Sequence, residues 1–532
     1  ALAVAATAVL TMGAAQAAYV EQGLKATASF NVDAAVASWE TDEYQADWGL
    51  AAMHASKAYA LGYHGQGVAV GVMDSGALLQ GHPDLAGDRF HASHAEGQFG
   101  SDGVRYPQGA GEQFDEDYKK GESFDITGDW VLNVNDSHGT HVTGTVGGNR
   151  DGVEFHGVSW GSQIWVGNTG GTDDTNYGPF LDHDYFRTAW GNLANDLIKA
   201  NGGDPTDAVS RSTSRGGVIN NSFGTNTRIV DPDPDTVNKR GPDGGSTDVH
   251  FPTNSVADIE YEYFLFNQVY SDKPYHDEEG QEQAGGKNFV DAAWEAVKGT
   301  NVVQVFTTGN RDFANPFYRP LYPYFNPEAE KNWVAVAGLQ QDGNGGYEII
   351  GTFNEAGHGK WWTVTAPGSG IYSSAVVEGS YVTPGVGEGA GKGLGDYTYA
   401  AWSGTSMAAP HVTGAMGVLM SRYQDMTAVQ IRDVLFTTAN HKNPDGTNMI
   451  GWDNADGTKV ADDEVSDRMG WGVPDLNKGM YGLGQLLGTF EYNMATAKLD
   501  VWSNDITAGA LKQRQREDEA FKKNAEAWNE VY

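Results

Sequence analysis

Short apolar runs alternate along this chain with longer segments in which apolar residues recur every three or four positions. The runs at residues 68–73, 217–220, 301–306 and 333–339 are typical of strands that are buried on both faces. The longer segments have one apolar side, as helices that pack on a sheet do. The alternation predicts an α/β fold, in which a mostly parallel central sheet carries helices on both faces.

The predicted helices have different local signals. Thr427 and Gln430 form the capping-box pattern that opens a helix. Residues 412–420 are apolar or small on every side, so we expect a helix that is buried all round. Other helices are expected to begin at Trp48, to span residues 184–198, and to present an apolar side formed by Phe289, Val290, Ala293 and Val297.

Two stretches interrupt this alternation. Residues 86–136 are rich in glycine and aspartate, and residues 225–286 are irregular, with prolines close together near their start. We expect both to be long acidic insertions at the surface. The 71 glycines follow no short period, which excludes a collagen-like chain and indicates many tight turns.

The first residues suggest export. Residues 1–13 are an apolar run too short to cross a bilayer, and Ala15-Gln16-Ala17 has the small-x-small pattern of a signal-peptidase site. We therefore predict a signal peptide over 1–17 whose basic start is missing, followed by an N-terminal extension over 18–47. A buried alanine-rich helix is the alternative. No later stretch reaches 18 apolar residues, so we expect no membrane-spanning segment.

Composition removes several classes of function. Acidic residues outnumber basic ones by 70 to 34, which gives a formal net charge of −36. Such a chain has no excess of Lys and Arg for phosphate groups, which argues against nucleic acids and anionic membrane surfaces as partners. The sequence has no cysteine. Disulfides, thiolate catalysis and zinc-thiolate sites are therefore excluded.

Three short segments carry candidate chemistry. Asp74 follows a predicted buried strand, where open α/β sheets place functional groups, although an Asp before a turn is often structural. His138 and His141 are three residues apart, without the glutamate of the zinc-protease pattern, and a capped loop histidine is the alternative. Ser406 lies near the start of the predicted buried helix, where free N–H groups favour the oxyanion that forms when a serine attacks.

Taken together, the three segments supply a nucleophile, a base and an orienting carboxylate in the order Asp74, His138, Ser406. Residues 73–76 (MDSG), 138–144 (HGTHVTG) and 404–410 (GTSMAAP) resemble the Asp, His and Ser motifs of the subtilisin-like serine proteases. The resemblance covers roughly residues 48–485. It implies a subtilisin-like three-layer fold and a catalytic domain over that range.

The resemblance also implies roles for further residues. Asn310 is similar in context to the family's oxyanion asparagine, and Ser222, Phe223 and Gly224 to the segment that binds the substrate backbone. No cofactor is expected for the chemistry. Many relatives hold structural calcium, and acidic loops are plentiful here, so structural calcium is possible, with its metal ligands unknown. The acidic residues could equally form a solvated surface.

The C-terminal residues 486–532 are predicted to be a tail with a helical linker. Their last part is charged and places Phe521, Ala525 and Trp528 on one helical stripe. Together with the motif at 220–224, this tail resembles the protease passengers of Gram-negative autotransporters. The resemblance implies tethering to an outer-membrane β-barrel that this chain does not include. A helical tail packed on the catalytic domain is the alternative.

The resulting hypothesis is a secreted or cell-surface serine endopeptidase, exported through the periplasm. It would act on protein or peptide substrates through an acyl-enzyme. The alternative is a catalytically inactive adhesin or binding module on the same fold. The usual sign of such a module is a lost catalytic residue, and Asp74, His138 and Ser406 are all present.

Overall fold

The chain is described from a computed structural model. The predicted signal peptide (1–17), the candidate Gly224, most of the insertion at 225–286 and most of the tail at 486–532 lie outside the described residues. The described residues are 32–100, 103–105, 116–169, 182–223, 237–240, 246–249, 275–276, 282–283, 289–310, 312–482, 512–517, 519 and 523.

A central sheet organises the described part of the chain, with strand order β15-β14-β13-β8-β1-β7-β2 and with β16 beside β14. All neighbours are parallel except β14 and β15. The prediction of a mostly parallel sheet is therefore confirmed. Its strands are β1 (Ala69–Asp74), β2 (Phe90–Ala92), β7 (Gln163–Asn168), β8 (Val218–Asn221), β13 (Val303–Thr307), β14 (Trp333–Gln341), β15 (Tyr347–Ile349) and β16 (Thr363–Pro367).

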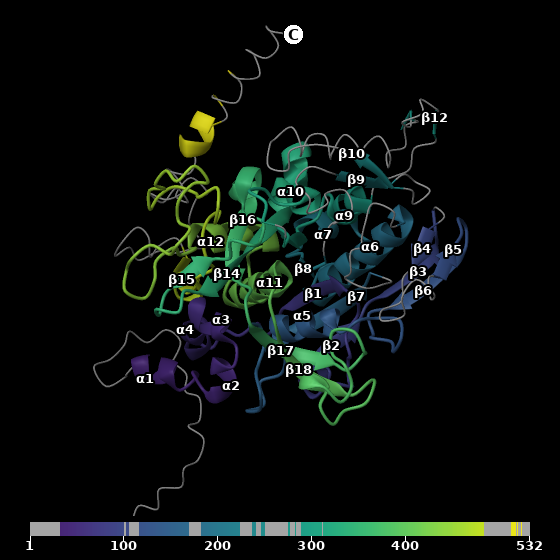
Figure 1. Cartoon of the computed structure of the whole chain (residues 1–532), viewed down its shortest axis with the longest axis horizontal. Coiled ribbons are helices and arrows are strands. Elements are labelled where there is room, and N and C mark those ends of the chain that lie inside the picture. Colours follow the sequence, from purple (N-terminus) through teal and green to yellow (C-terminus); the bar gives the residue numbers. More distant parts are fainter. Residues whose placement is uncertain are drawn as a thin grey trace, which may run out of the picture.

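Helices cover both faces of the sheet (Figure 1). Val70 and Gly71 are neighbours in β1 and therefore point to opposite faces. A Cβ on Gly71 would lie 3.1 Å from the Leu197 side chain, and a Cβ on Gly417 would lie 3.2 Å from Val70. The helix that contains Leu197 thus lies on one face, and the helix that contains Gly417 lies on the other. The helices of the two layers are α6 (His183–Ala200), α9 (Phe289–Val297), α5 (His138–Gly147) and α11 (Thr405–Arg422).

The predicted capping box is present at the start of α12 (Ala428–Thr437), where Thr427 and Gln430 exchange their hydrogen bonds. The helix expected from Trp48 differs from the prediction. It is divided into α3 (Trp48–Ala52) and α4 (Ala55–Ala60), because His54 adopts a left-handed conformation with φ of 54°. A single left-handed residue breaks the helical hydrogen-bond ladder.

Residues 32–47 form α1 (Val32–Ala37) and α2 (Asp42–Gln45). Trp39 and Tyr44 from this part of the predicted N-terminal extension are buried in the same hydrophobic cluster as the strands. This segment therefore contributes to the same core as the central sheet.

The predicted insertion at 86–136 is more regular than expected. It contains the edge strand β2 and two separate antiparallel pairs. The first is β3 (His94–Gln98) with β6 (Ser123–Thr127), and the second is β4 (Gly103–Arg105) with β5 (Glu116–Tyr118). Three of these strands, β2, β4 and β5, have only three residues each, which is too short for a periodic pattern to reveal.

A second hairpin, β17 (Ile371–Val376) with β18 (Tyr397–Trp402), lies along α5 and leads directly into α11 (Figure 1). None of the helices in the described part of the chain has the length and apolar character that a bilayer crossing requires.

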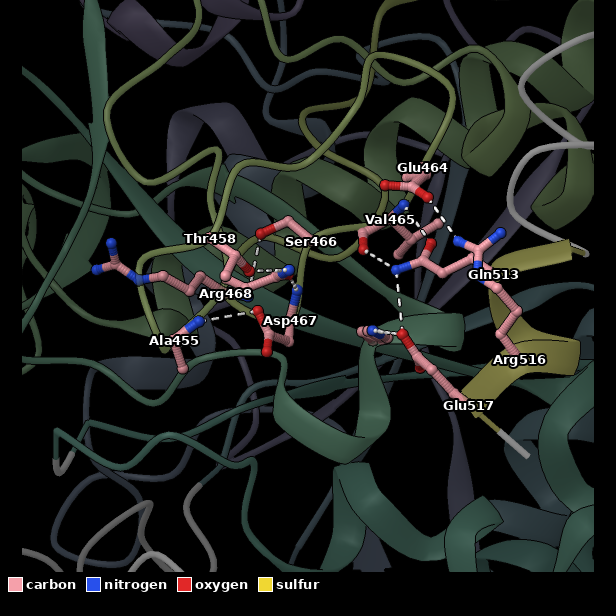
Figure 2. A network of polar contacts seen from close by, with 12 residues as sticks. Ala455, Thr458, Glu464, Val465, Ser466, Asp467, Arg468, Gln513, Arg516 and Glu517 are labelled. Carbon is pink, nitrogen blue, oxygen red and sulfur yellow. Dashed lines mark hydrogen bonds and ion pairs between the residues drawn. The ribbon is translucent and has the colours of Figure 1, made fainter. Parts of the chain in front are cut away.

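The described part of the tail packs on the domain that contains the central sheet. Residues 512–517 are helical, and the Gln513 side chain exchanges two hydrogen bonds with the backbone of Val465, at 2.9 and 3.0 Å. Arg514 makes a bidentate ion pair with Glu330, at 2.7 and 2.8 Å. Figure 2 shows Arg516 reaching Glu464 beside the Gln513 contact. For these residues, the contacts agree with the alternative of a tail packed on the domain.

Candidate active site

Asp74 and His138 meet at the carboxyl edge of the sheet. Asp74 is the last residue of β1, His138 is the first residue of α5, and both side chains are buried. Asp74 Oδ1 lies 2.8 Å from His138 Nδ1 and also accepts the backbone N–H of Ser75 at 2.8 Å. Because a carboxylate only accepts, Nδ1 must donate. Nε2 of the same ring is then the nitrogen that can accept a proton and act as the base.

A second buried carboxylate, Asp136, ties these two elements together. It accepts the backbone N–H of His138 at 2.9 Å and the hydroxyl of Ser75, and Ser75 Oγ accepts the N–H of Gly139 at 2.9 Å. The hydrogen bonds join the end of β1 to the first turn of α5. Our sequence reasoning gave Asp136 no role. The available signal was its position just before a helix, where an acidic side chain binds free N–H groups.

Ser406 is the second residue of α11 and is held by a reciprocal pair of hydrogen bonds. Pro410 has no N–H, so the Ser406 carbonyl lacks its usual partner four residues further along the helix. The hydroxyl of Ser222 donates to that carbonyl at 2.8 Å, and Ser406 Oγ donates to the Ser222 carbonyl at 2.6 Å. Ser222, which directly follows β8, therefore positions the candidate nucleophile.

Two N–H donors flank a space beside Ser406. Asn310 follows β13, and its Oδ1 accepts from the backbone N–H and the hydroxyl of Thr405 at 2.8 and 2.9 Å. A Cβ on Gly404 would lie 3.5 Å from Asn310 Nδ2 and 3.6 Å from Ser406 N. The missing side chain of Gly404 thus leaves a space that both nitrogens border, which is the arrangement that stabilises an oxyanion.

The Phe223 side chain lies in the core. It is 1% exposed, its ring stacks with Trp190, and the guanidinium carbon of Arg319 lies 4.5 Å from the ring centroid. Arg319 Nη2 also donates to the Phe223 carbonyl at 2.5 Å. The predicted substrate-binding role of this segment can therefore involve its backbone, whereas the Phe223 ring is committed to packing.

Calcium stays a prediction. In the described ranges, His, Asp and Glu side chains form no group of three that could hold a metal ion.

Asp84 is a buried acid whose pKa is strongly shifted, because burial raises the pKa of its carboxyl group to about 7. The hydrogen bond from Tyr399 opposes this rise, and the charges of Asp151, Glu43 and Glu154 add to it.

Asp84→Asn should raise Tm by about 5 °C at pH 8 in EDTA. Above pH 7 the folded protein has to ionise this buried carboxyl. As the pH falls below 7 the folded state takes up a proton that the unfolded state does not, so the destabilisation disappears. Thermal melts from pH 8 to pH 4 should show the gain shrinking. A gain that persists unchanged at pH 4 would contradict the assignment.

Comparisons with known proteins identify a family that this chain resembles. A model of the subtilase family matches residues 65–472. The extracellular serine protease of Serratia marcescens is 29% identical over 498 residues, covering 88% of this chain and 40% of that protein. The Neisserial autotransporter lipoprotein NalP of Neisseria meningitidis is 24% identical over 275 residues, covering 50% of this chain and 20% of that protein.

Among solved structures, fervidolysin from Fervidobacterium pennivorans, a keratinolytic enzyme related to subtilisin, aligns with a TM-score of 0.44 at 23% identity. The alignment covers 82% of this chain and 45% of that one. This chain spans 40% of the Serratia protein's length and less of NalP's.

Proposed function

This chain belongs to the subtilase family, and we propose that it is a secreted serine endopeptidase that works through Asp74, His138 and Ser406. The observation that carries the proposal is the 2.8 Å hydrogen bond between Asp74 and His138 Nδ1, at the sheet edge where Ser222 holds Ser406. A buried carboxylate that fixes the tautomer of a histidine allows that histidine to act as the general base for a serine.

In the proposed reaction, His138 Nε2 takes the proton of Ser406 as Oγ attacks the scissile carbonyl carbon. The oxyanion accepts hydrogen bonds from Asn310 Nδ2 and Ser406 N in the space beside Gly404. His138 then protonates the leaving amine, and water attacks the acyl-enzyme with His138 again acting as the base. Because the Ser406 hydroxyl donates to Ser222 O in this conformation, it must turn toward His138 before attack.

We further propose that the protein is exported as an autotransporter passenger. The names of two relatives, one extracellular and one an autotransporter, support this assignment. The lack of cysteine suits a chain that crosses the periplasm before it folds, because disulfides form in that compartment. Tethering to an outer-membrane β-barrel belongs to the same proposal.

Labelling with a fluorophosphonate tests the catalytic proposal, because the probe reacts only with an activated serine. The wild-type chain should become labelled, and Ser406→Ala should not. A folded wild-type chain that resists labelling would contradict the proposal. A circular dichroism melt of each sample separates misfolding from an intact but inactive site. The inactive binding module would melt normally and remain unlabelled.

A further inference from the structure

The loop between β17 and β18, in the hairpin that leads into α11, exposes apolar side chains. Tyr381, Val386 and Leu394 are 44%, 66% and 51% exposed. We call residues 377–396 the hairpin lobe. In a chain with a net charge of −36, exposed apolar groups on one loop make it a candidate contact surface.

The hairpin lobe has a packed interior of its own, which keeps Tyr381 in place. The Glu378 carboxylate accepts the backbone N–H groups of Ser380 and Val382 at 3.1 Å each, and that of Tyr381 as well. These hydrogen bonds fix the turn that presents the Tyr381 ring. The small hydrophobic cluster beneath it consists of Ala375, Val377, Val382 and Ala400, with Trp402 packed against them.

A chain of ring contacts connects the lobe to the active site. The ring centroid of Tyr381 lies 5.4 Å from that of Trp402, and Trp402 stacks on His141 at 4.4 Å and 15°. His141 lies one turn after His138 on the same side of α5. Burial lowers the pKa of His141 to about 3, so its ring is neutral. Its Nε2 lies 3.1 Å from the carbonyl oxygens of Ile371 and Ala400, which holds the hairpin against α5.

The order of the strands indicates which part of a substrate would pass the lobe. Asn310 follows β13, whereas His138 pairs with Asp74 on β1, and β8 lies between these two strands. The oxyanion faces Asn310, and the leaving amine receives its proton from His138. The polypeptide on the leaving-group side therefore runs past His138, toward Trp402 and Tyr381.

The distances suit a short extended peptide. Trp402 precedes Ser406 by four residues, which span at most about 13 Å. An extended substrate covers that distance in about four residues.

We propose that Tyr381, together with Trp402, forms a subsite for an apolar or aromatic side chain on the leaving-group side of the scissile bond, within about four residues of it. This inference rests on the proposed endopeptidase function. The occupant is the substrate polypeptide, because Tyr381 contacts Trp402, which lies four residues before Ser406 and stacks on His141, one turn after His138. Tyr381 is thus a specificity-determining residue, in a loop outside the three catalytic motifs.

Internally quenched peptides that differ only on the leaving-group side test the subsite. One set carries Phe or Leu at each of the second to fourth positions beyond the scissile bond, and a matched set carries Gly. A short peptide p-nitroanilide has no residues there. Tyr381→Ala should lower kcat/KM for the Phe and Leu peptides by about tenfold, mainly through KM. It should leave the Gly peptides and the p-nitroanilide unchanged, and Tyr381→Phe should retain the preference.

Tyr481→Ala is the matched control, because Tyr481 is 51% exposed in α13 (Leu476–Tyr481), which packs near the far end of α11. It should leave all three substrate types unchanged. An equal loss on every substrate would mean that Tyr381 supports the fold, and this would overturn the subsite. A wild type without preference for Phe or Leu would overturn it as well. A wild type that cleaves none of the substrates would instead refute the proposed function, and the subsite with it.

Discussion

Asp74→Asn should lower kcat by about 10⁴ while the protein stays folded. Asp74 Oδ1 accepts the proton of His138 Nδ1 at 2.8 Å in a fully buried setting. An asparagine amide placed there donates a proton, so His138 would have to accept at Nδ1 and carry its proton on Nε2. The nitrogen that should accept the Ser406 proton would then be blocked. Rates of peptide hydrolysis at saturating substrate measure the loss.

Asp136→Asn is the matched control for this variant. Asp136 is equally buried, and its bonds to the backbone N–H of His138 and the hydroxyl of Ser75 can be kept by an amide oxygen. We expect a loss of less than about tenfold in kcat, because the tautomer of His138 is not affected. Similar losses in the two variants would contradict the assignment of Asp74 as the orienting carboxylate.

Asn310→Ala should lower kcat by about 10² to 10³ and leave KM nearly unchanged. The amide nitrogen of Asn310 is needed only when negative charge develops on the substrate oxygen, so its removal affects the transition state more than substrate binding. The backbone N–H of Ser406 remains as a second donor, which is why some activity survives. Separate measurements of kcat and KM on one peptide distinguish this effect from a binding defect.

Thr405 provides the graded control for Asn310. Its hydroxyl and its backbone N–H both donate to Asn310 Oδ1 and so turn Nδ2 toward the space beside Gly404. Thr405→Ser keeps both donors and should retain nearly full activity. Thr405→Val removes the hydroxyl and should give an intermediate loss. An unchanged rate in Asn310→Ala would remove Asn310 from the mechanism.

The parts of the fold that could be predicted are those with a local signal. The strand that ends in Asp74 is buried along its whole length, which makes it a continuous apolar run. The helix after Thr427 has its capping box within four residues of sequence. The expected position of Ser406 near a helix N-terminus followed from the small apolar residues after it, and α11 begins at Thr405.

The features that escaped prediction depend on contacts between distant segments. The role of Asp136 arises because Ser75, 61 residues earlier, comes to lie beside it in the folded chain. The burial of Phe223 depends on Arg319 and Trp190, which flank it from two other helices. The break at His54 comes from one left-handed residue in a sequence that otherwise favours a helix. The spacing of residues along the chain does not indicate which distant residues come into contact in the fold.

Pro410 has a consequence for the timing of activity. The proline deprives the first turn of α11 of a backbone hydrogen bond. Ser222, which follows β8 and lies 184 residues earlier in the chain, replaces it. The nucleophile therefore acquires its working position only after these distant parts have joined. A nascent or unfolded chain contains Ser406 but no assembled active site. The cell that synthesises such a chain would be exposed to its proteolysis only once these distant segments have come together.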